Sequence, residues 1–399
     1  MTIQLNYMRF ARRMLNQTIR MFLNDRTPQA RRCDVLLIRK ITEAGRFLGY
    51  SNAARFNEKW ASDAIDILCE SVLRTPYGAA LELTSPLLAT LEITNACNKG
   101  CRVCYSNAVA RPSAPQRISG QIVAQLARSR IPAFLLTGGE PLEHPRIVEI
   151  LSCLLKTERM VSIATASLTP LVNELARQFP NKLTFVFSFW GDAEKHDHIR
   201  GNGSYAATTE FLQQLSREPA LCTINYVAPD SAEDLVAGLR QILSKSLKLH
   251  RIYVSRGIAV GRYPYATGQN VSRDFHSRLR SACESLGHKT QRPIVVTAPR
   301  KGDARPILDP WSTLVSRMFG IVWPRGCGVG NWTVHITADG DVRPCFAHEG
   351  TFGNVMNDCM DESWRMVRTY AKSIPSYLEC SAEASQLERT RDQMFVTLH

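Results

Sequence analysis

The chain has 399 residues and a formal net charge of +13, with 44% hydrophobic and 21% charged residues. This ordinary globular composition excludes a fully disordered chain. No apolar run approaches the roughly 18 residues that a membrane span needs, and the N-terminus lacks the apolar core of a secretory signal. The sequence therefore predicts a soluble, cytoplasmic protein of about two or three domains.

The N-terminal part reads as a basic helical extension. Residues 1–50 hold ten Arg or Lys and three Asp or Glu. Apolar residues recur at three- or four-residue steps from Met8 to Phe22, which predicts an amphipathic helix, and a second helix is expected at residues 57–73. Such a basic arm can contact nucleic acid, an anionic membrane surface or an acidic partner, or it can simply be a solvated face.

From residue 89 onward, short β-rich runs alternate with amphipathic segments. Six strand–helix units in series predict a parallel sheet with right-handed crossovers, either curled into a full or partial barrel or left open. Functional residues are then expected at the carboxyl ends of the strands. The expected strands are residues 90–94, 133–137, 161–165, 183–189, 222–226 and 251–254. The expected helices are residues 119–129, 145–155, 170–179, 205–215 and 231–243.

After these units the pattern changes again. A further helix is expected at residues 275–286, within a long connection. Beyond it, Trp332, Val334 and Ile336 alternate, and Asp339-Gly340 is a strong hairpin turn. The predicted divisions are an N-terminal helical extension (1–88), an α/β domain (89–310), a small cysteine-containing domain (311–380) and a C-terminal tail (381–399).

Three of the twelve cysteines lie close together directly after the first expected strand. Cys97, Cys101 and Cys104 have the spacing C-x3-C-x2-C. Three thiolates on one short loop can bind three irons of a four-iron cluster, which leaves the fourth iron open to a small molecule with an amine and a carboxylate. Zinc is the rival interpretation, although structural zinc prefers four protein ligands.

The second expected strand ends in Gly138-Gly139-Glu140-Pro141. Paired glycines at a strand end allow a ligand to approach the backbone closely. The carboxylate of Glu140 can accept a hydrogen bond from an amino group at that place. Two glycines alone are a weak signal, but one strand and one helix after the cysteine loop they are a strong one.

Together, the three-cysteine loop and Gly138–Pro141 resemble the cluster motif and the GGEP motif of the radical S-adenosylmethionine (SAM) superfamily. The resemblance implies a partial (β/α)6 TIM-like barrel, here with the N-terminal helical extension and a small C-terminal hairpin and helix domain. It implies that Cys97, Cys101 and Cys104 bind a [4Fe-4S] cluster whose open iron is chelated by SAM. One electron, from a donor such as flavodoxin or ferredoxin, would cleave SAM to methionine and a 5′-deoxyadenosyl radical, which abstracts hydrogen from carbon.

The resemblance also implies contacts to SAM along the barrel. Ser188 and Asn225 would face the ribose and Arg200 the carboxylate, although Ser188 and Asn225 are equally typical of ordinary polar groups at strand ends. The third strand ends in Thr165-Ala166-Ser167, where the resembled family often has Thr-Asn-Gly, so the resemblance does not extend to contacts made by that asparagine. The implied cofactor-binding residues are Tyr105, Gly138, Gly139, Glu140, Pro141, Ser188, Arg200 and Asn225.

A second metal site is expected near the C-terminus. The spacing Cys327-x12-Gly340-x4-Cys345 resembles the opening of a SPASM or twitch domain, which carries auxiliary iron–sulfur clusters. The rest of a SPASM pattern is missing, and only Cys359 and Cys380 remain downstream. The resemblance therefore implies at most one auxiliary cluster, bound by these four cysteines. A four-cysteine zinc site and a domain without metal remain alternatives.

The leading hypothesis is a radical SAM enzyme that modifies a peptide or peptide-derived natural product by oxidation, cross-linking or epimerisation. The alternative substrates are a sugar, a nucleoside, a lipid or another small metabolite. A non-enzymatic iron–sulfur or zinc protein that binds nucleic acid is the alternative of another class. It is disfavoured because a binding protein does not need an open iron beside a GGEP motif. The fold alone does not decide among substrates.

Overall fold

The computed structural model describes residues 59–76, 79–110, 118, 120–228, 232–245, 247–256, 261–262, 281, 294–296 and 330–373. The helix predicted near Met8–Phe22 lies outside the described residues, as do Cys327 and Cys380 and, apart from residue 281, the helix predicted at residues 275–286. Among the described helices, none is both long enough and apolar enough to cross a membrane.

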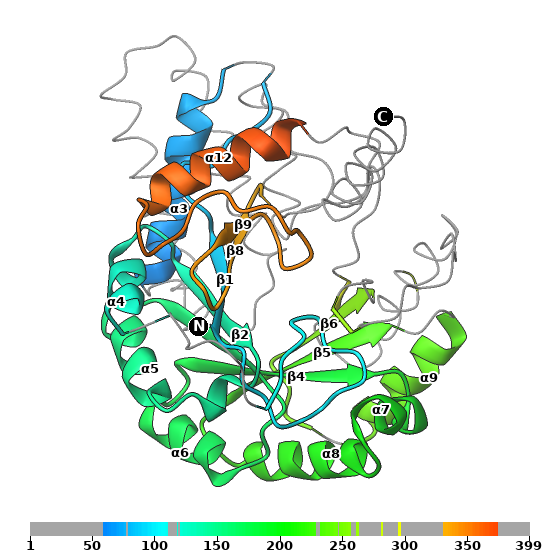
Figure 1. Ribbon diagram of the computed structural model, residues 1–399. Helices are drawn as coiled ribbons and strands as arrows, with labels where there is room; N and C mark the ends of the chain where they lie inside the picture. Colours follow the sequence, from blue (N-terminus) through cyan, green and yellow to red (C-terminus); the bar gives the residue numbers. More distant parts are fainter. Residues whose placement is uncertain are drawn as a thin grey trace, which may run out of the picture.

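A single nine-stranded sheet organises the described part of the chain, in the order β7-β6-β5-β4-β3-β2-β1-β8-β9. Neighbouring strands pair in parallel from β7 to β8, and β9 pairs antiparallel with β8. Figure 1 shows the sheet curving, with helices along its outer side. The strands are β1 (Leu88–Thr94), β2 (Ala133–Gly138), β3 (Met160–Thr165), β4 (Leu183–Trp190), β5 (Leu221–Ala228), β6 (Arg251–Arg256), β7 (Ile294–Val296), β8 (Thr333–Ile336) and β9 (Val342–Arg343).

Each of the first five parallel strands is followed by a helix, so the predicted partial TIM-like barrel is confirmed. All six strands expected from the sequence are present. Three described elements were not expected, namely the strand β7, the short helix η3 and the polar helix α7. The helices are α3 (Lys59–Arg74), α4 (Gly120–Arg128), η3 (Pro141–Glu143), α5 (Ile147–Lys156), α6 (Pro170–Gln178), α7 (Ala193–Arg200), α8 (Ser204–Leu215), α9 (Ala232–Leu243) and α12 (Met360–Ser373).

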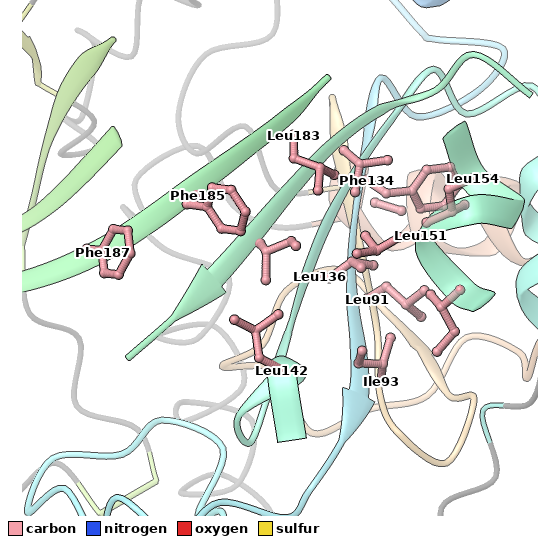
Figure 2. Packing of buried hydrophobic residues seen from close by; sticks show 14 of the residues in the cluster. Leu91, Ile93, Phe134, Leu136, Leu142, Leu151, Leu154, Leu183, Phe185 and Phe187 are labelled. Carbon is pink, nitrogen blue, oxygen red and sulfur yellow. The ribbon is translucent and has the colours of Figure 1, made fainter. Parts of the chain in front are cut away.

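The two faces of the sheet differ in polarity because side chains alternate along each strand. On β1, Leu91 and Ile93 join the main hydrophobic core, together with Phe134 and Leu136 of β2. Figure 2 shows Phe134 and Leu136 close to Leu151 and Leu154 of α5. The helices therefore cover the apolar face. The alternate residues, such as Glu92 and Thr137, which pair in the β1–β2 register, belong to the opposite, inner face.

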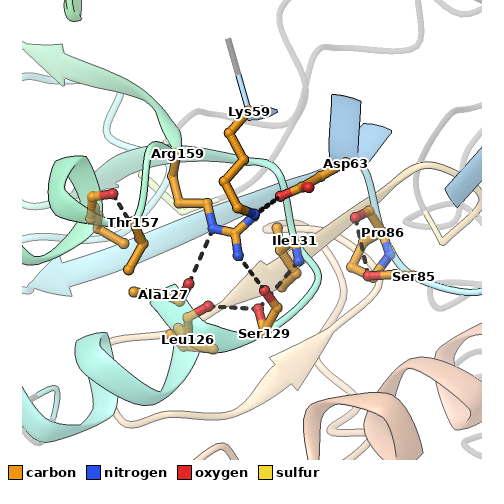
Figure 3. A network of polar contacts seen from close by, with 11 residues as sticks. Lys59, Asp63, Ser85, Pro86, Leu126, Ala127, Ser129, Ile131, Thr157 and Arg159 are labelled. Carbon is orange, nitrogen blue, oxygen red and sulfur yellow. Dashed lines mark hydrogen bonds and ion pairs between the residues drawn. The ribbon is translucent and has the colours of Figure 1, made fainter. Parts of the chain in front are cut away.

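A buried arginine joins the N-terminal helix to the barrel. Arg159, just before β3, donates hydrogen bonds to Asp63 of α3 (2.6 Å) and to the carbonyl oxygens of Ala127 (3.1 Å) and Ser129 (2.8 Å), as Figure 3 shows. These protein acceptors replace the water molecules that the guanidinium loses on burial. This network fixes α3 against α4 and the start of β3.

The C-terminal hairpin extends the same sheet. β8 pairs in parallel with β1, so that Leu91 lies beside Ile336. The indole Nε1 of Trp364, on α12, donates to the carbonyl of Leu83 (2.9 Å), and Arg368 donates to that of Leu81 (3.2 Å). Figure 1 accordingly shows α12 near α3 and the β8–β9 hairpin. The hairpin and α12, called the cap below (residues 330–373), share one core with the barrel.

Candidate active site

The three-cysteine loop leaves β1 and is fixed by its own backbone. The amide of Cys97 donates to the carbonyl of Val109 (2.9 Å), and the amide of Val109 donates to that of Asn95 (3.2 Å). Ala96 and Val109 form an isolated parallel bridge. The loop is therefore closed at its base, and Cys101 and Cys104 lie within the closed segment.

The paired glycines bring the end of β2 against this loop. The amide of Gly139 donates to the carbonyl of Thr94 (2.6 Å), and that of Glu140 donates to Ala96 (2.8 Å). A Cβ on Gly139 would overlap the carbonyl of Ala96, and a Cβ on Gly138 would overlap that of Thr94. The sequence predicted close approach of a ligand to this backbone. In the structure, the backbone of the cysteine loop also lies against these glycines, and the approach of a ligand stays a prediction.

Two further loops meet the cysteine loop. The amide of Arg102 donates to the carbonyl of Ile199 at the end of α7 (3.2 Å). The amide of Arg262 donates to the carbonyl of Cys104 (2.9 Å), and a Cβ on Gly261 would overlap the same oxygen. The segments that follow β1, β2, β4 and β6 thus converge, as expected because the carboxyl ends of parallel strands lie at the same edge of a sheet.

Tyr105 joins the cysteine loop to β2. Its hydroxyl lies 2.6 Å from Oγ1 of Thr137 and accepts a hydrogen bond from the amide of Gly138 (3.1 Å). Burial raises the pKa of this phenol, and the nearby Glu92 raises it further. Phe346 of the cap contacts the Tyr105 ring edge-on, with centroids 5.1 Å apart. The cap therefore reaches the residue that follows the third cysteine, a contact that the sequence did not reveal.

Glu140 is 2% exposed and its carboxylate is fully engaged. It accepts hydrogen bonds from the hydroxyl of Thr165 (2.6 Å) and the amides of Ala166 (2.8 Å) and Leu142 (3.2 Å). Burial raises the pKa of this carboxyl, and the bonds from Thr165 and Ala166 oppose the rise. The side chain therefore ties the end of β2 to the end of β3, and buried Pro141 begins the short helix η3 that follows.

That role also explains the unusual end of β3. The Thr165-Ala166-Ser167 segment, which departs from the pattern of the resembled family, supplies two of the three donors to Glu140. The Thr165 hydroxyl in turn accepts from the amide of Ser167 (2.9 Å). The sequence alone indicated only that this segment differs from the family pattern. The hydroxyl donor of Thr165 was the one feature that could have indicated a bond to Glu140.

The remaining predicted contacts lie along β4, α7 and β5. Ser188 and Asn225 are register partners on adjacent strands, so their side chains share a face. Oδ1 of Asn225 accepts a hydrogen bond from Ser255 (2.9 Å). Arg200 ends α7, next to the Ile199 carbonyl that binds the cysteine loop, and within the described part of the chain its Nε has no hydrogen-bond partner.

The thiols of Cys97, Cys101 and Cys104 are free and half-buried. Burial raises the pKa of the Cys97 thiol, and Glu140 and Cys101 add to the rise. Among the described residues, no three His, Cys, Asp or Glu side chains gather so as to hold one metal ion. A four-iron cluster binds each thiolate through a different iron, so three accessible thiols spaced around one fixed loop are a donor set that fits it.

The C-terminal cysteines are described only in part. Cys345 is buried and Cys359 is exposed, just before α12. Cys345 directly precedes Phe346, the residue that contacts Tyr105. Because Cys327 and Cys380 lie outside the described residues, the proposed four-cysteine set stays a prediction.

The fold and the loop cluster define a partial α/β barrel with a three-cysteine loop at the carboxyl ends of its strands. Residues 91–236 match the radical SAM superfamily. The sporulation killing factor maturation protein SkfB of Bacillus subtilis (strain 168) is 25% identical over 333 residues, which cover 77% of this chain and 70% of SkfB. The subtilosin biosynthesis protein AlbA of the same strain is 25% identical over 69% of this chain and 59% of AlbA.

Solved structures agree with this fold. SuiB of Streptococcus suis bound to S-adenosylmethionine aligns with a TM-score of 0.54 at 15% identity, covering 85% of this chain and 80% of SuiB. Native anSMEcpe with bound AdoMet aligns with a TM-score of 0.50 at 15% identity, covering 71% of this chain and 82% of anSMEcpe. The match places residues 91–236 of this chain in the radical SAM superfamily. The chain is an enzyme, and its cofactors are a [4Fe-4S] cluster and SAM.

Proposed function

We propose that this enzyme modifies a peptide or peptide-derived natural product by abstracting hydrogen from carbon. The observation that carries the proposal is the convergence of the segments after β1, β2, β4 and β6 on one cysteine loop. Peptide substrates are supported by the relatives. SkfB is a maturation protein and AlbA a bacteriocin biosynthesis protein, and SuiB has been crystallised with its precursor peptide SuiA. The chain spans only 59% of the length of AlbA, so the comparison covers part of that protein.

In this proposal the chain positions the cofactors. Cys97, Cys101 and Cys104 ligate the cluster, and the strand end at Gly138–Pro141 meets the amino group of SAM. When bound, the cluster and SAM together supply a 5′-deoxyadenosyl radical, which removes hydrogen from carbon. The carboxylate of Glu140, held by the end of β3, keeps the β2 end in place beside the cysteine loop.

Polar groups on the inner face orient the rest of SAM. Ser188 and Asn225, which are register partners, meet the ribose. Arg200 meets the carboxylate through its planar guanidinium, whose Nε has no partner within the described residues. Phe346 of the cap lies against Tyr105 and helps to exclude water from the loop.

The cap is proposed to hold at most one auxiliary iron–sulfur cluster, on Cys327, Cys345, Cys359 and Cys380. Zinc or no metal at these four cysteines would change the net reaction, since a second cluster can accept an electron from a substrate radical. A flavodoxin or ferredoxin in the cytoplasm is the proposed electron donor. The net outcome, whether oxidation, cross-linking or epimerisation, follows from the substrate.

The test is iron, sulfide and SAM cleavage by anaerobically reconstituted protein. About four irons with 5′-deoxyadenosine formation in dithionite are expected from one cluster, and about seven or eight from two. Added precursor-type peptides should raise 5′-deoxyadenosine formation and, when deuterated, should transfer deuterium into it. Transfer from a deuterated sugar or nucleoside, with none from peptides, would overturn the peptide proposal and leave radical chemistry intact.

Two cysteine variants separate the two metal sites. C101A should abolish SAM cleavage because the cluster loses one of three ligands. C345A should lower iron by one cluster and spare uncoupled SAM cleavage. Unchanged iron in C345A would instead show that Cys345 holds zinc or no metal.

A further inference from the structure

The inner face of the barrel continues onto the cap as a row of polar side chains. In the parallel register, His335 of β8 pairs with Thr90 of β1, so it shares the inner face with Thr90 and Glu92. Arg343 of β9 is the antiparallel partner of His335. Directly opposed residues of an antiparallel pair lie on the same face, with Cβ atoms about 4.5–5.5 Å apart. Glu92, His335 and Arg343 therefore form one row across three strands.

The side chains of His335 and Arg343 each already have a polar contact on one nitrogen. Nε2 of His335 lies 3.4 Å from Oε1 of Glu92, and a terminal nitrogen of Arg343 donates to Asp341 (3.4 Å). A carboxylate beside Nε2 favours the tautomer with its proton on Nε2, which leaves Nδ1 as an acceptor. The geometry therefore fixes the two side chains but does not use all their polar atoms.

The unused atoms are an acceptor and a donor on adjacent strands. Nδ1 of His335 and Nε of Arg343 are both shielded from solvent, and neither has a hydrogen-bond partner within the described part of the chain. His335 as a whole is only 3% exposed. Buried polar atoms without partners are uncommon and call for a ligand or an ordered water. One neighbouring acceptor and one donor match the N–H and the C=O of an amide.

His335 is linked to the cysteine loop through one side chain of the cap. The ring of Phe346 contacts His335 with centroids 6.4 Å apart and Tyr105 with centroids 5.1 Å apart. Phe346 is 37% exposed, although its ring contacts both His335 and Tyr105. A ligand that displaces the Phe346 ring would therefore contact both residues.

We propose that His335 and Arg343 recognise one backbone amide of the peptide substrate. His335 Nδ1 accepts the amide N–H, Arg343 Nε donates to the carbonyl, and Glu92 holds the imidazole in the required tautomer. This inference rests on the proposed peptide substrate. It assigns to the cap the positioning of the chain that is modified.

The test is a binding cycle with isosteric variants. H335N places an amide oxygen near the position of Nδ1, whereas H335L removes the acceptor. R343Q places an amide N–H near the position of Nε, whereas R343M removes the donor. Affinity is measured by fluorescence anisotropy with a labelled peptide that raises 5′-deoxyadenosine formation. H335L and R343M should each weaken binding about tenfold, and H335N and R343Q should recover most of it.

A single-atom change in the peptide makes the test specific. Replacing each amide N–H in turn by an ester oxygen should cost about tenfold in affinity at one position in the parent, and less than about twofold at that position in H335L. V334A, which alters the opposite face of β8, controls for general loosening and should keep the full ester penalty. A merely structural role for His335 would not remove a penalty at one peptide position.

The outcomes separate this inference from the proposed function. If peptides raise 5′-deoxyadenosine formation but the ester penalty is the same in H335L and the parent, the recognition pair is wrong and the peptide function stands. If no peptide binds or stimulates, the proposed function fails, and this inference fails with it. If H335L is too unstable to assay, equal peptide affinity of the parent and R343M overturns the pair.

Discussion

At the scale of single residues, Gly139 shows why the position after β2 admits no side chain. Its amide binds the carbonyl of Thr94, and a Cβ would overlap the carbonyl of Ala96. Because the obstacle is backbone, it can yield only if the cysteine loop moves. G139A should therefore lower the free energy of unfolding by at least about 2 kcal/mol and reduce the iron bound per chain after reconstitution.

Gly100 provides the matched control, since it lies on the same loop. It has φ +61° but open space around its Cβ position. G100A should cost only the left-handed strain of about 1–2 kcal/mol and retain iron. Urea unfolding and iron analysis of both variants measure these effects. Parent-like iron and stability in G139A would show that the loop does not need this close approach.

His196 makes stability depend on pH. It is fully buried against Phe189 and Tyr205, and its Nδ1 accepts from the amide of Trp190 (3.3 Å). Burial, with a smaller contribution from Arg200, lowers the pKa of this imidazole from 6.5 to about 4. A depressed histidine pKa means that the fold favours the neutral ring. Its stabilising contribution is therefore present above pH 6.5 and is lost as the pH falls toward 4.

We expect the parent to lose up to about 3 kcal/mol more stability than H196N between pH 7.5 and pH 4.5. Asparagine can keep an acceptor for the Trp190 amide but does not titrate in this range. Urea unfolding of both full-length proteins at several pH values gives the difference in slope. If stability depends on pH in the same way in the parent and in H196N, the pKa of His196 is not lowered by burial.

At the scale of elements, the attachment of α3 depends on Asp63. This carboxylate binds both Lys59 and the buried Arg159, at 2.6 Å each. D63N leaves the guanidinium of Arg159 without its anionic partner. The cost should be about 1–3 kcal/mol, below the value for a fully buried pair because Asp63 is 23% exposed.

The exposed pair between Arg130 and Glu70 is the control, because Glu70 lies on the same helix. E70Q should cost less than about 1 kcal/mol, since solvent screens that pair. Urea unfolding measures both variants. Equal losses in D63N and E70Q would show that burial of Arg159 adds nothing to the attachment of α3.

Some elements were predictable because their signal is local. The apolar run at residues 183–189 gives β4 (Leu183–Trp190), and the run at 133–137 gives β2 (Ala133–Gly138). The polar helix α7 escaped detection because it has little apolar periodicity. Its N-cap was nevertheless readable, since the side chain of Asp192 accepts from the amide of Lys195.

The site was predictable to the level of its motifs but not of its contacts. The spacing of Cys97, Cys101 and Cys104 and the paired glycines locate the loop cluster at the strand ends. The bonds from Thr165 to Glu140 and the contact of Phe346 with Tyr105 join segments far apart in sequence. Periodicity carries no information about such pairings, because it reports which face of an element is buried and not what covers it.

At the scale of the whole molecule, the cap and the barrel share one sheet and one hydrophobic core. β8 extends the sheet beyond β1, and Trp364 donates a hydrogen bond to Leu83 beside the first strand. Val334, Ile336 and Trp364 belong to the same core cluster as Leu91. Removing the cap would expose both the edge of β1 and this apolar surface, which favours aggregation.

A chain ending at residue 332 should therefore be recovered mostly insoluble, or without the near-ultraviolet circular dichroism of a packed core. A chain ending at residue 380 keeps β8, β9 and α12 and is the matched comparison, expected to remain soluble and to unfold in one transition. The soluble yield of the two chains is compared, and their urea unfolding is followed by both fluorescence and circular dichroism. If the shorter chain is soluble and has the unfolding midpoint of the parent, the barrel folds alone and the cap is a separate domain. The hairpin residues His335 and Arg343 would then be free to move relative to the cysteine loop, and the cap could not position a substrate as rigidly as the continuous sheet implies.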